Sequence, residues 1–260
     1  MNPQFSTTNC RLQIIPNLQS FRAGWIRFGF SFRGKPFTCL SEITVATCAV
    51  QTPRSSKGTA SAMSAISVSQ LCKSYDGRRA VQDLSFEVQK GETFALLGPN
   101  GAGKTTTIEI LEGYRQADSG SVSVLGLDPE KQAAELKRRT GLVLQTTALE
   151  PELTIRETIT AFARLYRAPR EIAAVLVDVN LAHLQDNRVG NLSGGQKRRL
   201  EIALGIVGDP ELIFLDEPTT GLDPEARRKI WTLIQRLNNN GCTIVLSSHY
   251  MDEVQALASH

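Results

Sequence analysis

The sequence has 260 residues, 41% of them hydrophobic, and a chain of this size can bury a sizeable core in one or two domains. Its net charge of +3 is due to the N-terminal segment: residues 1–63 contain seven basic residues and one acid. Residues 64–260 contain 22 basic and 25 acidic residues. This mildly acidic body argues against a nucleic-acid partner. The five cysteines are widely spaced, which disfavours a disulfide scaffold or a zinc site, and no apolar run approaches the length of a transmembrane helix.

Residues 1–63 differ from the rest of the chain in composition. They are poor in acids and rich in serine, threonine and arginine, which is typical of an organellar transit peptide. Alternatively, Met63 is the true start and the preceding residues are an extraneous or disordered leader, or they form a small domain. We favour Met63 as the start and expect the folded domain in 64–260.

The beginning of that domain has the pattern of an antiparallel β hairpin. Hydrophobic alternation predicts strands over 66–72 and 84–88, and Asp76-Gly77 between them is a turn signal. Tyr75 stands directly before this turn. Its ring could stack on a purine base, or it could be an ordinary turn tyrosine, and the residues alone leave both readings open.

The next segment has the pattern of a phosphate-binding loop. An apolar run over 93–97 predicts a buried strand, and a helical pattern over 107–114 follows a glycine-rich stretch. That stretch is Gly98, Pro99, Asn100, Gly101, Ala102, Gly103, Lys104, Thr105 and Thr106. Its glycines let successive backbone N–H groups point at one anion, and the helix N-terminus adds partial positive charge. Lys104 can then reach the β- and γ-phosphates of a nucleotide, and the Thr105 hydroxyl can ligate Mg²⁺.

Further strands are predicted over 121–125 and 141–144, with a helix over 131–139 between them. Gln145 ends the second of these strands. Ligands of α/β sheets bind at the carboxyl ends of the strands, so Gln145 is a candidate site residue. The alternative is a solvated glutamine in a loop.

From 153 to 185 the pattern is helical only. Thr154 and Glu157 have the spacing of a capping box, with Thr154 at the N-cap, and a second helix is predicted over 170–179. A wholly helical insert in a βα pattern indicates a subdomain.

A second anion-binding geometry follows in Asn191 to Gln196, which leads into a helix predicted over 197–207. Ser193, Gly194 and Gly195 form its turn. One nucleotide rarely needs two phosphate cradles in one chain. We therefore expect this second cradle to serve a nucleotide that is held by another copy of the chain.

Acidic residues follow the next predicted strand, over 211–215. Asp216 at the end of a buried strand can hold Mg²⁺ through water, and the adjacent Glu217 can polarise an attacking water molecule. Residues 221–224 begin a helix that is predicted to reach Leu237. A last strand is predicted over 242–246, and His249 follows its end, at the edge of the sheet where Gln145, Asp216 and Glu217 are expected.

Together these motifs resemble the ATP-binding cassette (ABC) ATPases over residues 64–258. Residues 98–106 resemble their Walker A motif, 192–196 their signature motif, and 212–218 their Walker B motif with its catalytic glutamate. Residues 221–224 resemble the D-loop. Gln145 resembles the Q-loop glutamine, His249 the switch histidine and Tyr75 the adenine-stacking aromatic. The resemblance implies an α/β fold: a P-loop NTPase core with a parallel sheet, an N-terminal antiparallel β subdomain, and an inserted α-helical subdomain at about 150–207.

The resemblance also implies ATP and Mg²⁺ as cofactors. The expected catalytic residues are Glu217, His249, Lys104 and Gln145. The expected nucleotide contacts are Tyr75, the loop 98–106, and Ser193, Gly194, Gly195 and Gln196. The expected metal site consists of Thr105, Gln145 and Asp216.

The function that the resemblance implies is ATP hydrolysis in a head-to-tail dimer, made of two identical or two related cassettes. The dimer would drive export of a drug, antibiotic or similar substrate through a separate membrane permease, from the inner face of the cell membrane, or in an organelle if 1–63 is a transit peptide. The alternatives are a soluble ABC ATPase that acts in translation or on DNA, and an inactive truncated cassette. Family members usually continue further past the switch histidine, so we expect a C-terminally truncated cassette.

Overall fold

The computed structural model describes residues 64–145 and 147–258, and four short strands before them. These strands are β1 (Arg11–Ile14), β2 (Ser31–Phe32), β3 (Lys35–Pro36) and β4 (Thr44–Cys48). The remaining residues of 1–63 lie outside the described part, so the predictions about the nature of that segment stay predictions.

A three-stranded antiparallel sheet begins the main body of the chain. Its strands are β5 (Ser64–Tyr75), β6 (Arg78–Gln89) and β8 (Ser119–Val124), in the order β6-β5-β8. Asp76 and Gly77 connect β5 to β6 with φ angles of +47° and +76°, which is the left-handed backbone of a tight hairpin turn. The predicted hairpin is therefore confirmed, with both strands longer than expected. The third strand comes from beyond the glycine-rich loop.

The core sheet is parallel over four strands, in the order β7-β11-β10-β9. They are β7 (Thr93–Leu97), β9 (Thr140–Val143), β10 (Leu212–Asp216) and β11 (Thr243–Ser248). Three of them, β7, β10 and β11, are buried throughout, as is typical of parallel strands that are covered on both faces. Because all four run in one direction, their carboxyl ends lie at the same edge of the sheet. At the other side of β7, β4 pairs antiparallel with it, and β1 pairs with β4.

The two faces of the core sheet contact two different sets of side chains. Phe94 and Phe214 pack on the side of the antiparallel sheet, where the rings of Phe86 and Phe94 stack with centroids 4.7 Å apart. Ala95 and Leu215, one residue further along their strands, pack on the side of the helices. Alternate residues of a strand point to opposite faces, so each strand takes part in both cores.

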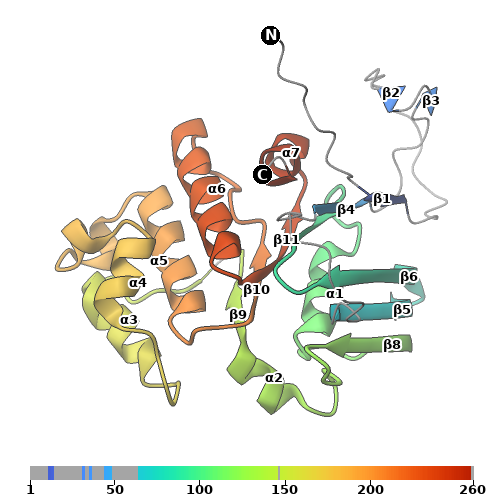
Figure 1. Cartoon of the computed structure of the whole chain (residues 1–260), viewed down its shortest axis with the longest axis horizontal. Helices are drawn as coiled ribbons and strands as arrows, with labels where there is room; N and C mark the ends of the chain where they lie inside the picture. Colours follow the sequence, from blue (N-terminus) through green and yellow to red (C-terminus); the bar gives the residue numbers. More distant parts are fainter. Residues whose placement is uncertain are drawn as a thin grey trace, which may run out of the picture.

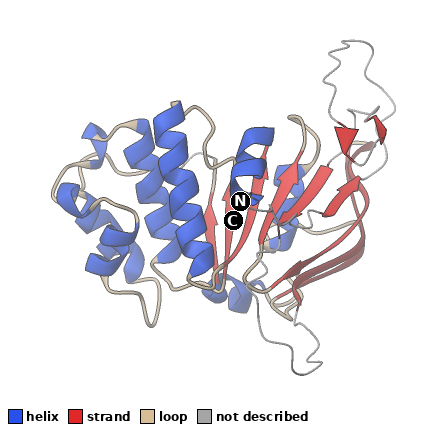
Figure 2. Ribbon diagram, turned by 45° about the horizontal axis from the view of Figure 1, so that its top comes forward, coloured by secondary structure: helices blue, strands red, loops and turns tan. Residues whose placement is uncertain are grey.

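Seven α-helices complete the described part of the chain. They are α1 (Lys104–Leu111), α2 (Ala133–Arg139), α3 (Ile155–Ala163), α4 (Ile172–Asp178), α5 (Gly194–Ile206), α6 (Pro224–Asn239) and α7 (Met251–Ala258). In Figure 1, α3, α4 and α5 lie on one side of β9 and β10, whereas α1 lies on the other side with the antiparallel sheet. Figure 2 shows the core strands between these two groups. No helix within 64–145 and 147–258 combines the length and the apolar character needed to cross a membrane.

A local sequence signal explains where α3 begins. Thr154 caps α3, because its hydroxyl accepts the Glu157 N–H and the Glu157 carboxylate accepts the Thr154 N–H, which confirms the predicted capping box.

The helix α5 packs against β9 so closely that a Cβ on Gly141 would lie 2.1 Å from the Gly205 carbonyl oxygen. Only glycine at position 141 permits that approach.

Candidate nucleotide-binding site

The glycine-rich loop leaves the end of β7 and enters α1 at Lys104. Gly101 and Gly103 have φ angles of +81° and +89°, which non-glycine residues rarely adopt. A Cβ on Gly103 would lie 2.2 Å from the carbonyl oxygen of Ala80 on β6, so the loop is held tightly against the antiparallel sheet. The helix begins three residues earlier than predicted. Consequently the N–H groups of Thr105 and Thr106 belong to its first turn, which has no carbonyl partners within the helix and attracts anions.

Lys104 curls back over the loop that precedes it. Its ammonium donates hydrogen bonds to the carbonyl oxygens of Gly98, at 2.9 Å, and Pro99, at 3.1 Å. It also lies 3.6 Å from Glu217 Oε1, and the residue is only 5% exposed. A buried ammonium among carbonyl and carboxylate oxygens is positioned to exchange those partners for phosphate oxygens, as expected for a phosphate-binding loop.

Asp216 and Thr105 meet between β10 and α1. The Thr105 hydroxyl donates to Asp216 Oδ2 at 3.3 Å, and the Ser247 hydroxyl donates to Asp216 Oδ1 at 2.5 Å. A hydroxyl and a carboxylate oxygen at this separation fit the hard oxygen ligands of Mg²⁺, which binds through one or two protein groups together with phosphate and water. The donor set therefore fits the predicted magnesium site. The third predicted ligand, Gln145, is exposed at the end of β9.

Glu217 stands where the strand ends converge. Its Oε1 lies 3.2 Å from His249 Nδ1, and its Oε2 accepts hydrogen bonds from Gln145 Nε2 at 3.4 Å and Thr220 Oγ1 at 3.0 Å. His249 Nδ1 makes this approach without hydrogen-bond geometry. With Lys104 near the same carboxylate, all four predicted catalytic residues are neighbours. Glu217 itself has a φ angle of +45°, a strained conformation of the kind that concentrates at functional sites.

Sequence reasoning missed the residues that hold this strained turn in place. The Ser247 hydroxyl accepts the Glu217 N–H at 2.9 Å while it donates to Asp216. Glu253 is buried and accepts hydrogen bonds from Thr219, at 2.9 Å, and Ser248, at 2.6 Å. Burial raises the pKa of the Glu253 carboxyl. The position of Ser247 at the carboxyl end of a strand could have identified it, whereas nothing local singles out Glu253.

Tyr75 lies at the end of β5, where its ring faces two cations. The Arg115 guanidinium lies 5.2 Å and the Lys73 ammonium 5.7 Å from the ring centroid, and the Tyr75 hydroxyl is buried without a partner. A purine base would compete with these cations for the ring. Adenine stacking on Tyr75 stays a prediction.

The second cradle opens α5 and has its own capping box. The Ser193 hydroxyl accepts the Gln196 N–H, and the Gln196 side chain accepts the Ser193 N–H at 2.8 Å. The Gln196 side chain is thus used to cap the helix, whereas Ser193 and Gly194 are exposed. Within the described part of one chain, these residues make no hydrogen bond to 98–106. Figure 1 places α5 and α1 on opposite sides of the core strands.

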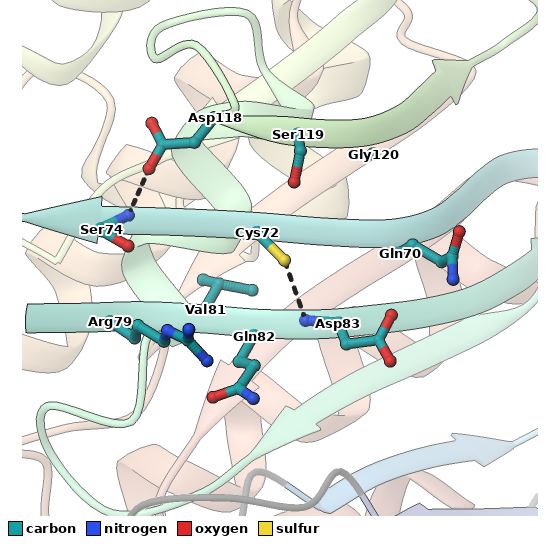
Figure 3. Close-up of a pocket in the computed structure, with 10 residues that line it drawn as sticks. All are labelled: Gln70, Cys72, Ser74, Arg79, Val81, Gln82, Asp83, Asp118, Ser119 and Gly120. Atoms are coloured by element: carbon teal, nitrogen blue, oxygen red, sulfur yellow. Dashed lines mark hydrogen bonds between the residues drawn. The ribbon is translucent and has the colours of Figure 1, made fainter.

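A hollow of about 620 Å³ lies elsewhere, on the antiparallel sheet (Figure 3). Strands β5, β6 and β8 line it, and none of the predicted site residues does. Several of its polar groups already have partners: Cys72 Sγ accepts the Asp83 N–H, and the Asp118 carboxylate accepts the Ser74 N–H (Figure 3) and the Lys73 ammonium. The phosphate-binding geometry is therefore at the strand ends of the core sheet and not in this hollow.

The fold and this site are those of an ATP-binding cassette, and comparison with known proteins agrees. The ABC transporter family profile matches residues 81–220, more than half of the chain. The chain belongs to the ABC transporter family, and its α/β P-loop fold is confirmed. The profile includes the glycine-rich loop, Gln145, the second cradle and the acidic pair, whereas Tyr75 and His249 lie outside it.

Among individual proteins, the chain is similar to "Nod factor export ATP-binding protein I" of Burkholderia pseudomallei (strain 1710b). The two are 45% identical over 197 residues, which are 74% of this chain and 65% of that protein. The protein of the same name from Rhizobium meliloti (strain 1021) is 43% identical over 198 residues, which are 74% of this chain and 59% of that protein. The chain thus spans less than two thirds of the length of these relatives.

Solved structures give the same result. An ATP-binding cassette of an ABC transporter in its ADP conformation superposes with a TM-score of 0.67 at 28% identity, over 74% of this chain and 84% of that one. The cbiO1 protein of Clostridium perfringens, described as part of the ABC transporter complex cbiONQ, superposes with a TM-score of 0.68 at 28% identity, over 74% of this chain and 80% of that one.

Proposed function

We propose that this chain is the ATP-hydrolysing subunit of an ABC exporter, and that it works as a dimer with a membrane permease. The observation that carries the proposal is the position of Glu217. Its carboxylate lies beside Lys104, Gln145 and His249, and it directly follows Asp216, which bonds to Thr105. Acid, ammonium, imidazole and metal-binding oxygens at one strand edge are the groups that phosphoryl transfer to water requires.

Each group has a distinct task in this reaction. The loop 98–106 and Lys104 bind the phosphates of ATP, and Thr105, Asp216 and Gln145 are the residues that would hold Mg²⁺. Bound Mg²⁺ supplies neutralisation of the charge on the phosphate oxygens. Glu217 orients a water molecule and accepts its proton, and His249 contacts the γ-phosphate from the end of β11. Positioning and charge stabilisation contribute most to catalysis in this class of reaction.

A second copy of the cassette supplies the rest of the site. Ser193 is exposed, and α5 and α1 lie on opposite sides of the core strands (Figure 1), which supports a head-to-tail pair in which each signature motif closes on the other copy's ATP. Either two identical chains or two related cassettes satisfy this arrangement.

Two further observations support a partner in the membrane and export as the direction of transport. Exposed apolar side chains lie next to Gln145 and near the end of α3: Leu144 is 47%, Phe162 38% and Leu165 77% exposed. Such a surface suits a permease that docks against the helical stretch and follows its movement. The relatives' name, Nod factor export, supports export of a cargo that the permease selects. The cassette would lie at the inner face of the cell membrane.

The proposal is tested by measuring phosphate release from MgATP by the full chain and by Glu217→Gln. The variant keeps the size of the side chain but cannot accept a proton. We expect it to bind ATP, to form a stable dimer and to release phosphate roughly 100- to 10,000-fold more slowly. Glu211→Gln is the matched control, since Glu211 precedes β10 at the opposite end of the strand and pairs with Arg139. Turnover of Glu217→Gln at the rate of the control would remove Glu217 from this role.

A further inference from the structure

Arg198 is a buried arginine in the second turn of α5, only 7% exposed. Its guanidinium donates four hydrogen bonds. Three reach backbone carbonyl oxygens, those of Pro218 from Nε at 2.9 Å, Leu144 from Nη1 at 2.6 Å and Asp216 from Nη2 at 2.8 Å. The fourth goes from Nη1 to the Glu201 carboxylate at 2.6 Å, which balances the buried charge.

The three carbonyls belong to the two segments that carry the catalytic groups. Leu144 directly precedes Gln145 at the end of β9. Asp216 and Pro218 stand on either side of Glu217 at the end of β10. One planar guanidinium therefore joins the Q-loop glutamine to the turn of the catalytic glutamate, across two neighbouring strands. Lysine could not do this, because a single ammonium lacks the rigid fork of donors that reaches all three carbonyl oxygens.

The turn at Glu217 needs such support. Its left-handed backbone, with a φ angle of +45°, takes the chain out of the β10 ladder. Ser247 accepts the Glu217 N–H at 2.9 Å. Arg198 donates hydrogen bonds to the carbonyls of Asp216 and Pro218, the residues before and after Glu217. A strained conformation persists only when its surroundings fix it from several directions, and these two residues do so.

The same helix begins with the second cradle. Ser193–Gly195 and Arg198 share α5, and a helix rises about 1.5 Å per residue, so the guanidinium's anchor lies within about 8 Å of the cradle along the axis. The helix start is itself packed tightly, since a Cβ on Gly195 would lie 2.9 Å from Ala226 Cβ on α6. A displacement of the cradle would therefore move Arg198, and with it the carbonyls that position Gln145 and Glu217.

We propose that Arg198 is a positioning residue that links the cradle at 193–195 to the chain's own Gln145 and Glu217. When the cradle closes on the nucleotide of a second copy, Arg198 sets the orientation of the water-activating carboxylate in its own site. The inference rests on the proposed function and adds to it a route by which the two sites of a dimer affect each other.

The test compares Arg198→Lys with Arg170→Lys in the full chain. Arg170 is a partly buried arginine whose guanidinium pairs with Asp178 at 2.6 Å, within the helical stretch. The thermal midpoint, the affinity for a non-hydrolysable ATP analogue, and the kcat and KM of phosphate release are measured for both variants. We expect Arg198→Lys to lower kcat about 10- to 100-fold while the affinity for the analogue changes less than about threefold, because misplacement of catalytic groups affects turnover and not uniform binding. Arg170→Lys should keep the kcat of the unmodified chain.

Amide hydrogen exchange gives a second measurement that does not depend on turnover. In Arg198→Lys, exchange in 144–145 and 216–220 should be at least about fivefold faster than in Arg170→Lys, with other segments alike. Unchanged exchange in these segments, or a kcat within about twofold of the control, overturns the role of Arg198. Absence of hydrolysis by the unmodified chain instead overturns the proposed function, and the exchange measurement then still decides whether Arg198 holds the two segments.

Discussion

The side chains of His249 and Glu217 meet at the ends of two neighbouring parallel strands, with Nδ1 of the histidine 3.2 Å from Oε1 of the glutamate. Replacing His249 with glutamine removes the imidazole and keeps a polar side chain. We expect kcat for ATP hydrolysis to fall about 100-fold, with a smaller change in KM, because the imidazole acts on the reacting γ-phosphate and not on the adenine of ATP. His183→Gln is the control, since His183 is exposed in a short 3₁₀ turn. Equal kcat values for the two variants would contradict the catalytic role.

Asp216 should determine how much Mg²⁺ the reaction needs. Asp216→Asn keeps an oxygen beside Thr105 but loses the negative charge, so the Mg²⁺ concentration for half-maximal activity should rise at least about tenfold. The measurement is a magnesium titration at saturating ATP. Asp186→Asn serves as the control, because the Asp186 side chain is 81% exposed. A titration curve that coincides with the control's would show that Asp216 is not at the metal.

Two chains that are each inactive should restore activity when mixed, if the site is shared between copies. Lys104→Ala disables the first cradle and Ser193→Arg obstructs the second. In a head-to-tail pair of one of each, one composite site keeps both intact cradles. Random pairing of equal amounts then leaves about a quarter of the sites functional, and phosphate release should recover to roughly that level. A mixture as inactive as its components at every concentration would argue for a site within one chain.

Glu112 makes the stability of the fold depend on pH. Burial, and secondarily the nearby Asp216 and Glu109 carboxylates, raise the pKa of the Glu112 carboxyl to about 8. A folded-state pKa above the unfolded value means that the neutral acid is favoured in the fold. The contribution of Glu112 to the stability of the fold is thus fully present below about pH 4.5 and is lost as the pH rises through about 8.

Glu112→Gln should remove this loss. We expect the free energy of unfolding of the variant, relative to the unmodified chain, to increase from pH 6 to pH 8 by up to about 1.4 kcal/mol per pH unit. Urea unfolding at a series of pH values measures it, with the exposed Glu135→Gln as the control. Parallel profiles for all three proteins would place the Glu112 carboxyl in a solvated site.

Gly141 should tolerate no side chain. A Cβ there would lie 2.1 Å from the Gly205 carbonyl oxygen, which is backbone of α5 and cannot rotate away. Gly141→Ala should therefore reduce the free energy of unfolding by about 2–4 kcal/mol through overpacking. At Gly190, which is also outside the left-handed region, the Cβ would lie 3.2 Å from Pro151, so Gly190→Ala should cost less than about 1 kcal/mol. Urea unfolding of the two variants compares them.

The sequence determined the local features of this protein. The strand over 93–97 and the capping box at Thr154 match the structure, as does the turn at Asp76-Gly77. Glycine conformations, caps and turn residues act within a few positions of the chain, which is why the sequence determines these features. Even here the first helix begins at Lys104 and not at Thr107, since residues of a phosphate-binding loop carry little helical pattern.

Only the tertiary structure decided which distant residues meet. It placed β8 beside β5 and β4 beside β7, although long stretches of sequence separate each pair. It also brought the Arg198 guanidinium to the carbonyls around Glu217. No local residue pattern predicts such contacts. Strand order depends on how whole hydrophobic faces pack, and a buried guanidinium binds whichever carbonyls that packing leaves without partners.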